Sequence, residues 1–149
     1  MVKSKHKFLI ALVGVVVCVC IIAFLIIKSS MKTKTFGDFI GNPSPDISKV
    51  TMMDGGTGRS VFTTDNSKIK ELLTVLGNTQ YRRASNQEGR DGFRYSYNFY
   101  VGDKLIMGMW DTGYMANVYD TFYETTIEPR DGIENWYNSI VASTSVKKK

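Results

Sequence analysis

Residues 93–111 read FRYSYNFYVGDKLIMGMWD, and this stretch decides the fold expected for the chain. From Phe93 to Val101, apolar or aromatic side chains alternate with more polar ones, which is the period of a β-strand with one buried face. Gly102 and Asp103 then form a two-residue turn, because glycine adopts the positive φ values that tight hairpins require. A second apolar run follows the turn. The stretch therefore predicts a β-hairpin within an antiparallel sheet.

The register of this hairpin determines which side chains share a face of the sheet. We expect Val101 to face Lys104, with Phe99 opposite Ile106, Tyr97 opposite Gly108 and Tyr95 opposite Trp110. The face opposite the aromatic row then carries Tyr100, Leu105, Met107, Met109, Ala116 and Val118. Two short helices cover one face of such a sheet, and the aromatic row fills more volume as core. The candidate partner surface is therefore Tyr100, Leu105, Met107 and Met109, with a core role for this row as the alternative.

The flanking sequence supplies further strands and two helices. Residues 47–53 and 59–64 form two strands joined by the glycine-rich residues 54–58, where a following strand favours a hairpin over a phosphate loop. A helix follows Asp65, and its apolar positions are Ile69, Leu72, Leu73 and Leu76. Further strands cover residues 80–84, 114–119 and 122–125, and a last helix follows Pro129. The predicted fold class is α+β with a mainly antiparallel sheet, in the order β-β-α-β-β-β-β-β-α, preceded by an N-terminal transmembrane helix.

Residues 8–27, FLIALVGVVVCVCIIAFLII, contain no charge from Phe8 to Ile27. Twenty residues of helix extend about 30 Å, the thickness of a bilayer core. This pattern predicts a transmembrane signal-anchor helix, and cleavage after it is the alternative. The chain then divides into a short basic cytoplasmic tail (1–7), the span (8–27), a linker (28–46), an extracytoplasmic domain (47–142) and a basic tail (143–149). Within the linker, Phe36, Phe39 and Ile40 either dock on the domain or lie free of it. The expected location is the cell membrane, with the N-terminus cytoplasmic and the domain outside.

The distribution of charge argues against a nucleic-acid partner. The chain has 19 basic and 14 acidic residues and a formal charge of +5. Nine lysines lie in the two ends, so residues 35–146 hold 10 basic and 14 acidic residues and a formal charge of −4. A nucleic-acid binder clusters Lys and Arg on its folded face. We therefore expect no nucleic-acid binding.

The domain lacks the residues on which most catalytic and metal sites depend. His6 is the only histidine, and both cysteines, Cys18 and Cys20, lie in the apolar segment. This excludes Ser-His-Asp and Cys-His catalysis and zinc sites of His and Cys within the domain. Most acidic residues adjoin Gly, Thr or Asn, as is typical of turns and caps. We predict no enzyme activity, cofactor or metal, with hydrolysis by paired carboxylates as the alternative.

The order of these features resembles a group of small bacterial domains. The features are a lysine-rich tail, an apolar segment, a linker, a hairpin, TTDNSKIKELLTVL (63–76), an aromatic meander and NWYNSI (135–140). Over residues 47–141 the chain resembles small membrane-anchored or lipoprotein-type extracytoplasmic domains of Gram-positive bacteria with no known function. It differs from the lipoprotein members because no small residue directly precedes Cys18 or Cys20. The resemblance implies no catalytic residue.

The sequence thus predicts a single-pass, membrane-anchored, extracytoplasmic binding module of the bacterial envelope. Its expected partner is a protein or an envelope component, bound without catalysis. Two alternatives remain open at this point. One is a structural subunit of a secretion or DNA-transfer complex, and the other is an envelope hydrolase with paired carboxylates.

Overall fold

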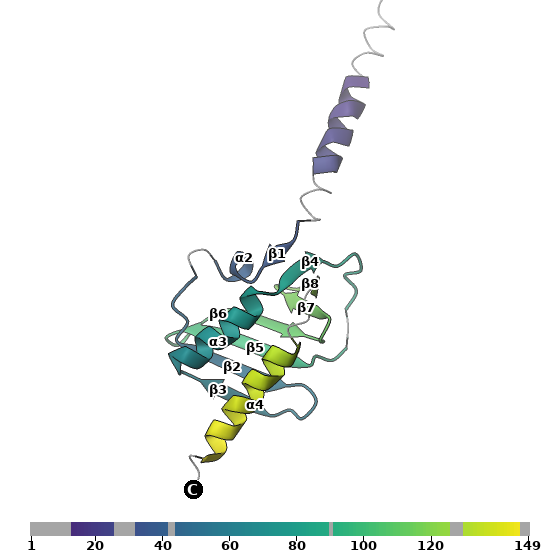
Figure 1. Cartoon of the computed structure of the whole chain (residues 1–149). Helices are drawn as coiled ribbons and strands as arrows, with labels where there is room; N and C mark the ends of the chain where they lie inside the picture. The colour runs from purple at the N-terminus through teal and green to yellow at the C-terminus, as the bar shows by residue number, and fades with distance from the viewer. Residues whose placement is uncertain (1–12, 26–31, 42–43, 90, 126–129, 147–149) are drawn as a thin grey trace, which may run out of the picture. The chain divides into compact units, whose positions relative to one another are not determined.

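The computed structural model describes residues 13–25, 32–41, 44–89, 91–125 and 130–146 (Figure 1). The chain divides into two compact units, Met1–Lys32 and Thr33–Lys149. In the first unit, residues 13–25 form a helix whose side chains are exposed. The second unit contains the sheet and the remaining helices of the described residues.

The prediction of a transmembrane signal-anchor helix over residues 8–27 is wrong for the described residues of this segment. No helix among the described residues is long and apolar enough to cross a membrane. The rest of the predicted span, including Phe8 and Ile27, lies outside the described residues.

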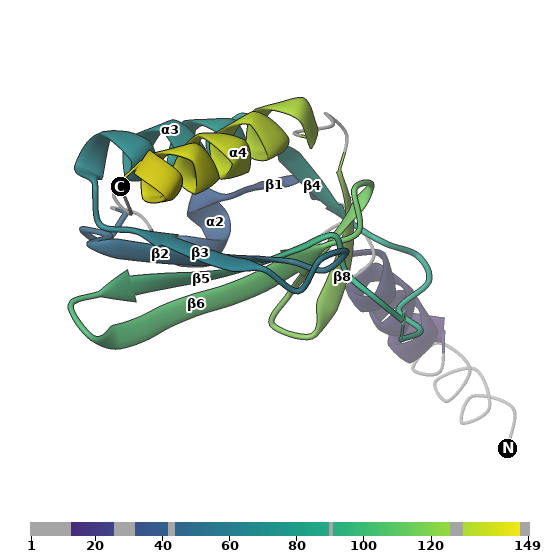
Figure 2. The same cartoon turned by 90° about the horizontal axis from the view of Figure 1, so that it is seen from below.

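The second unit has eight strands and three helices among its described residues. In chain order they are β1 (Lys34–Thr35), α2 (Gly37–Ile40), β2 (Lys49–Asp54), β3 (Ser60–Thr63), α3 (Asn66–Gly77), β4 (Gln80–Arg83), β5 (Tyr95–Val101), β6 (Lys104–Asp111), β7 (Met115–Val118), β8 (Thr121–Thr125) and α4 (Arg130–Val146). The strands form one antiparallel sheet in the order β1-β4-β8-β7-β6-β5-β2-β3. Figure 2 shows α3 and α4 lying across one face of this sheet, called here the inner face.

The predicted fold class is corrected at its N-terminal side as well. Residues 28–46 were predicted as a linker, but β1 and α2 lie within them, and β1 pairs with β4 at one edge of the sheet. Asp38 accepts hydrogen bonds from the backbone N–H and the hydroxyl of Thr35, at 2.7 and 3.0 Å, which stabilises the turn into α2. The Phe36 side chain is 3% exposed and its ring lies 5.2 Å from that of Phe99. Burial of Phe36 therefore attaches this segment to the core.

Helix α3 begins where the sequence predicts it. The Asp65 carboxylate accepts hydrogen bonds from the backbone N–H groups of Ser67 and Lys68, which is the N-cap arrangement. The apolar stripe of α3 faces the sheet, and its buried residues are Ile69, Leu72 and Leu76. Helix α4 packs beside α3, and the indole N–H of Trp136 donates a 2.6 Å hydrogen bond to the backbone oxygen of Lys68. This bond satisfies the polar atom of a fully buried Trp136.

A β-bulge changes the predicted register of the β5–β6 hairpin. Tyr100 pairs with Leu105, but Phe99 pairs with Met107, so Ile106 is an extra residue in β6. A one-residue shift moves every following side chain to the other face of a sheet. Tyr97 therefore pairs with Met109 in place of Gly108. The aromatic row and the methionine row share the inner face.

Candidate interaction surface

On the side of the sheet opposite the helices, called here the outer face, the loop after β4 is attached to β8 through Gln87. The Gln87 side chain donates hydrogen bonds to the backbone oxygens of Ala84 and Phe122, at 2.7 and 3.0 Å, and accepts one from the Phe122 N–H. Beneath this loop, Ala84, Met115 and Phe122 form a small second core, against which Trp110 packs. These four residues account for the part of the outer face formed by β8, β7 and the adjoining end of β6.

The other part of the outer face belongs to β3, β2, β5 and β6, and we call its side chains the outer patch. The register places in it Lys49, Thr51, Met53, Ser60, Phe62, Ser96, Asn98, Tyr100, Leu105, Gly108 and Trp110. Phe62 is 66% exposed and Leu105 is 51% exposed. No helix of the described part of this unit lies on that side in Figure 2.

The outer patch is poor in charge and rich in aromatic and apolar groups. Lys49 is its single charged residue, and the Lys49 ammonium lies 4.3 Å from the centre of the Tyr100 ring. On β6, a Cβ added at Gly108 would lie 3.1 Å from the side-chain oxygen of Asn98, so glycine leaves room for the Asn98 side chain there. Depletion of charge with enrichment of aromatic residues and Met is typical of the centres of protein interfaces.

The structure separates the four residues of the predicted partner surface. Tyr100 and Leu105 lie in the outer patch. Met107 and Met109 are 2% and 4% exposed and lie in the core, so their predicted placement on an open face is corrected. The bulge at Ile106 causes this difference, because it turns the two methionines to the inner face.

Phe62 is the surface residue that the sequence analysis did not single out. It lies at an outward position of the alternating strand β3, between the buried Val61 and Thr63. The alternation of residues 59–64 indicates that Phe62 points away from the core. It does not show whether another element covers the Phe62 side chain.

The clearest polar site inside the fold is a buried pair of side chains. The Tyr97 hydroxyl donates to one oxygen of Asp111, and the Gly113 N–H donates to the other oxygen at 3.1 Å. Burial raises the pKa of Asp111, and burial together with this carboxylate raises the pKa of Tyr97 well above its usual value. The adjacent cavity has about 10 Å³, roughly the space of one water. This pair is therefore suited to holding β5 against β6 rather than to binding a ligand.

Two open hollows near the sheet do not bring carboxylates together. One, of about 390 Å³, includes Asp91, Arg94 and Tyr114, and the Arg94 guanidinium forms a 2.6 Å ion pair with Glu134. The acidic residue in the lining of this hollow is Asp91. The acidic residue in the lining of the buried cavity is Asp111. Hydrolysis by paired carboxylates requires two such groups in one site, and that alternative stays a prediction. Among the described residues there is also no group of three or more His, Cys, Asp or Glu side chains able to hold a metal.

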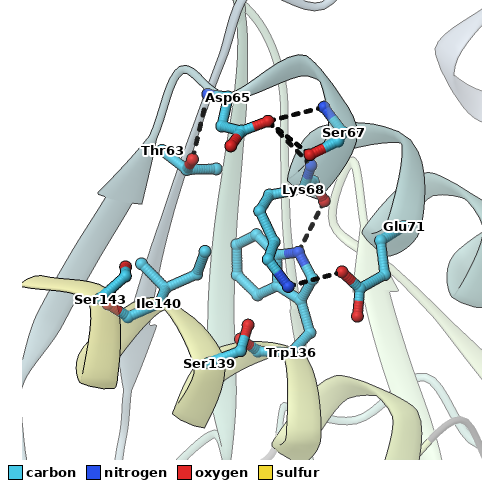
Figure 3. Close-up of polar contacts among 9 residues, drawn as sticks. All are labelled: Thr63, Asp65, Ser67, Lys68, Glu71, Trp136, Ser139, Ile140 and Ser143. Carbon is cyan, nitrogen blue, oxygen red and sulfur yellow. Dashed lines mark hydrogen bonds and ion pairs between the residues drawn. The ribbon is translucent and has the colours of Figure 1, made fainter.

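The second open hollow, of about 420 Å³, follows the free edge of the sheet (Figure 3). Its lining comes from the end of β3, the start of α3 and the C-terminal half of α4, and consists of Phe62, Thr63, Thr64, Asp65, Lys68, Ile140 and Ser143. The Lys68 ammonium forms a 2.8 Å ion pair with Glu71, and the Asp65 carboxylate caps α3. This edge hollow adjoins the outer patch through Phe62.

Comparison of the chain with protein-family models, with curated proteins and with solved structures finds no match. The resemblance to Gram-positive extracytoplasmic domains therefore stays a prediction.

Proposed function

We propose that the sheet domain is a binding module that engages a protein partner through the outer patch, without catalysis. The observation that carries this proposal is the exposure of Phe62 and Leu105 in the outer patch, whose single charged residue is Lys49. Large apolar side chains gathered on one face cost free energy in water and mark sites of association. The half-buried Tyr100 and Trp110 add aromatic area to the same face.

The shape of the patch supports a protein partner over a small molecule. A small ligand requires a concave pocket that covers most of its surface. The outer patch lies on four neighbouring strands of the sheet, and Gly108 leaves one position on β6 without a side chain. A flat, weakly charged surface with aromatic groups matches the composition of interface centres.

Site-specific photo-crosslinking tests this function. A photoreactive phenylalanine analogue at Leu105 in the full chain should give a crosslinked protein adduct in cells that make this protein. The matched control carries the analogue at Lys70, which is exposed on α3. Adducts of equal yield from both positions would contradict the proposal.

A second variant separates specific binding from nonspecific contact. Tyr100→Glu places a charge in the patch without removing a core side chain, since Tyr100 is only half-buried. Desolvation of that charge in an interface should abolish most of the Leu105 adduct. Unchanged far-UV circular dichroism would confirm that the fold is intact, and an unchanged adduct yield would count against the patch.

A further inference from the structure

We infer that β3 is a self-association edge, where a second copy of this chain adds its own β3 antiparallel to form a continuous sheet across a two-fold axis. This interface shares Ser60 and Phe62 with the outer patch, but it does not rest on the function proposed for that patch. It uses the main-chain edge of β3, whereas the outer patch uses side chains on the open face.

The first support is that no strand among the described residues pairs with the outward edge of β3. Within the sheet, β3 pairs with β2 and ends the strand order. The Asp54 N–H donates to the Arg59 oxygen at 3.0 Å, which marks this pair as hydrogen-bonded. Because hydrogen-bonded and non-hydrogen-bonded pairs alternate, the main-chain groups of Ser60 and Phe62 point away from β2. Such a row of groups is a template for another strand.

The second support is that one register of self-pairing is complementary in charge. If Phe62 lies opposite the second copy's Phe62, then Ser60 lies opposite Thr64 and Arg59 lies opposite Asp65. This register also places the outward main-chain groups of both strands in hydrogen-bonded pairs. Opposite charges across an antiparallel pair favour that register over its neighbours. The two-fold axis repeats the Arg59–Asp65 contact on both sides of Phe62.

The side chains that this register uses are available in the described structure. Arg59 is exposed, and its guanidinium forms no ion pair within the part of the chain that the structure describes. One oxygen of Asp65 caps α3, and the other has no hydrogen bond among the described residues. Hydrogen bonds from Ser67 lower the pKa of Asp65, so the carboxylate is charged at neutral pH. The edge hollow beside Asp65 and Lys68 has about 420 Å³, which leaves room for an incoming arginine.

The short length of β3 determines how strongly two copies of the chain are expected to associate. β3 has four residues, so the paired edges bury less surface than the roughly 1,200 Å² of a standard stable interface. The association should therefore be weak and should rise with concentration. A covalent trap suits such a contact better than an equilibrium measurement.

Disulfide trapping tests the register in the full chain with Cys18 and Cys20 changed to Ala. Opposed Cα atoms in a hydrogen-bonded antiparallel pair lie about 5.5 Å apart, which a disulfide can bridge. Phe62→Cys should therefore form a covalent dimer under mild oxidation. Ser60→Cys is the matched control, because two copies of residue 60 would lie about 14 Å apart in this register. We expect at least a tenfold higher dimer yield for Phe62→Cys.

A second pair of variants keeps Phe62 in place. Ser60→Cys combined with Thr64→Cys should form the covalent dimer, since these positions oppose each other, whereas each single variant should not. In that double variant, Arg59→Glu should lower the yield because it faces the second copy's Asp65. Adding Asp65→Ser should recover the yield, because serine retains the helix cap and removes the repulsion.

Equal dimer yields at residues 60 and 62, or no dimer from either design, would overturn the proposal. Equal yields would show association through another part of the chain. A monomer that still forms the Leu105 photo-adduct would leave the outer patch intact as a binding surface and reject β3 as the self-association edge. The two proposals therefore fail independently.

Discussion

At the residue scale, Met107 and Met109 show how one inserted residue changes the role of its neighbours. Both side chains lie in the core with the aromatic residues of β5, whereas Leu105, two residues before Met107, is half exposed to solvent. Met107→Ala should lower the free energy of unfolding by about 2–5 kcal/mol, because it removes buried atoms and leaves a cavity. Urea denaturation measures this loss.

Leu105→Ala is the matched control for this prediction. An exposed position away from special backbone features changes stability by no more than about 0.5 kcal/mol. If Met107→Ala and Leu105→Ala had equally small effects, the placement of the methionine row in the core would be incorrect.

Asp111 gives a pH-dependent prediction at the same scale. Burial raises its pKa above the value of 3.8 that applies in the unfolded chain. The folded state then binds this proton more tightly, so the contribution to stability is full below that value and is lost as the pH rises through the folded pKa. The unfolding free energy of the wild type minus that of Asp111→Asn should therefore fall with rising pH in this window.

Urea titrations of both proteins at several pH values measure this difference in unfolding free energy. The contributions of the other carboxylates are the same in both proteins and cancel in the difference. A difference that rises with pH would mean that the Tyr97 and Gly113 hydrogen bonds outweigh burial at Asp111. A constant difference would mean that the pKa of Asp111 is unchanged on folding.

At the element scale, the β-bulge in β6 consists of one extra residue, Ile106, which has no pairing partner in β5. Deletion of Ile106 leaves Tyr100 opposite Leu105 and Phe99 opposite Met107 in a regular ladder. The variant should therefore fold with the same residues in the core, although it loses the contacts of the partly buried Ile106. Near-UV circular dichroism of the buried tyrosines and a cooperative urea transition measure this outcome.

The control for this deletion removes Met109 from the regular part of β6. That deletion takes away a buried side chain and forces a new register on the residues before it, so it should abolish the cooperative transition. If both deletions unfolded the chain, the bulge would be essential for the hairpin and not a removable insertion.

At the scale of the whole molecule, the domain depends on a segment that its sequence pattern assigns to a linker. Phe36 is buried against Phe99, and Phe39 packs its ring 5.2 Å from Tyr81 and 4.9 Å from Tyr123. Phe36→Ala should therefore lower the free energy of unfolding by about 3–5 kcal/mol.

Lys32→Ala provides the control for Phe36→Ala, because Lys32 is exposed just before β1. It should change the unfolding free energy by no more than about 0.5 kcal/mol. A comparably small effect of Phe36→Ala would show that the segment contributes little to the stability of the sheet.

Local sequence patterns were sufficient for several elements and for part of the candidate site. The N-cap at Asp65, the apolar stripe of α3 and the alternation of Tyr95, Tyr97 and Phe99 depend on neighbours within a few residues, so they can be read directly. The outward positions of Tyr100 and Leu105 lie next to the turn, where the register begins correctly.

Tertiary structure decided the rest, because those features depend on contacts between distant segments. The bulge at Ile106 leaves no local signal, since both alternating rows of β6 are apolar and either can face the helices. The docking of Phe36 requires the ring of Phe99 from β5, and the cover over Phe122 requires Gln87 from a polar loop. By itself, the sequence determined which segments become strands β2 to β8 and helices α3 and α4, whereas β1 and α2 were not predicted. The packing of these elements determined which face is core, which face is open and which edge is free.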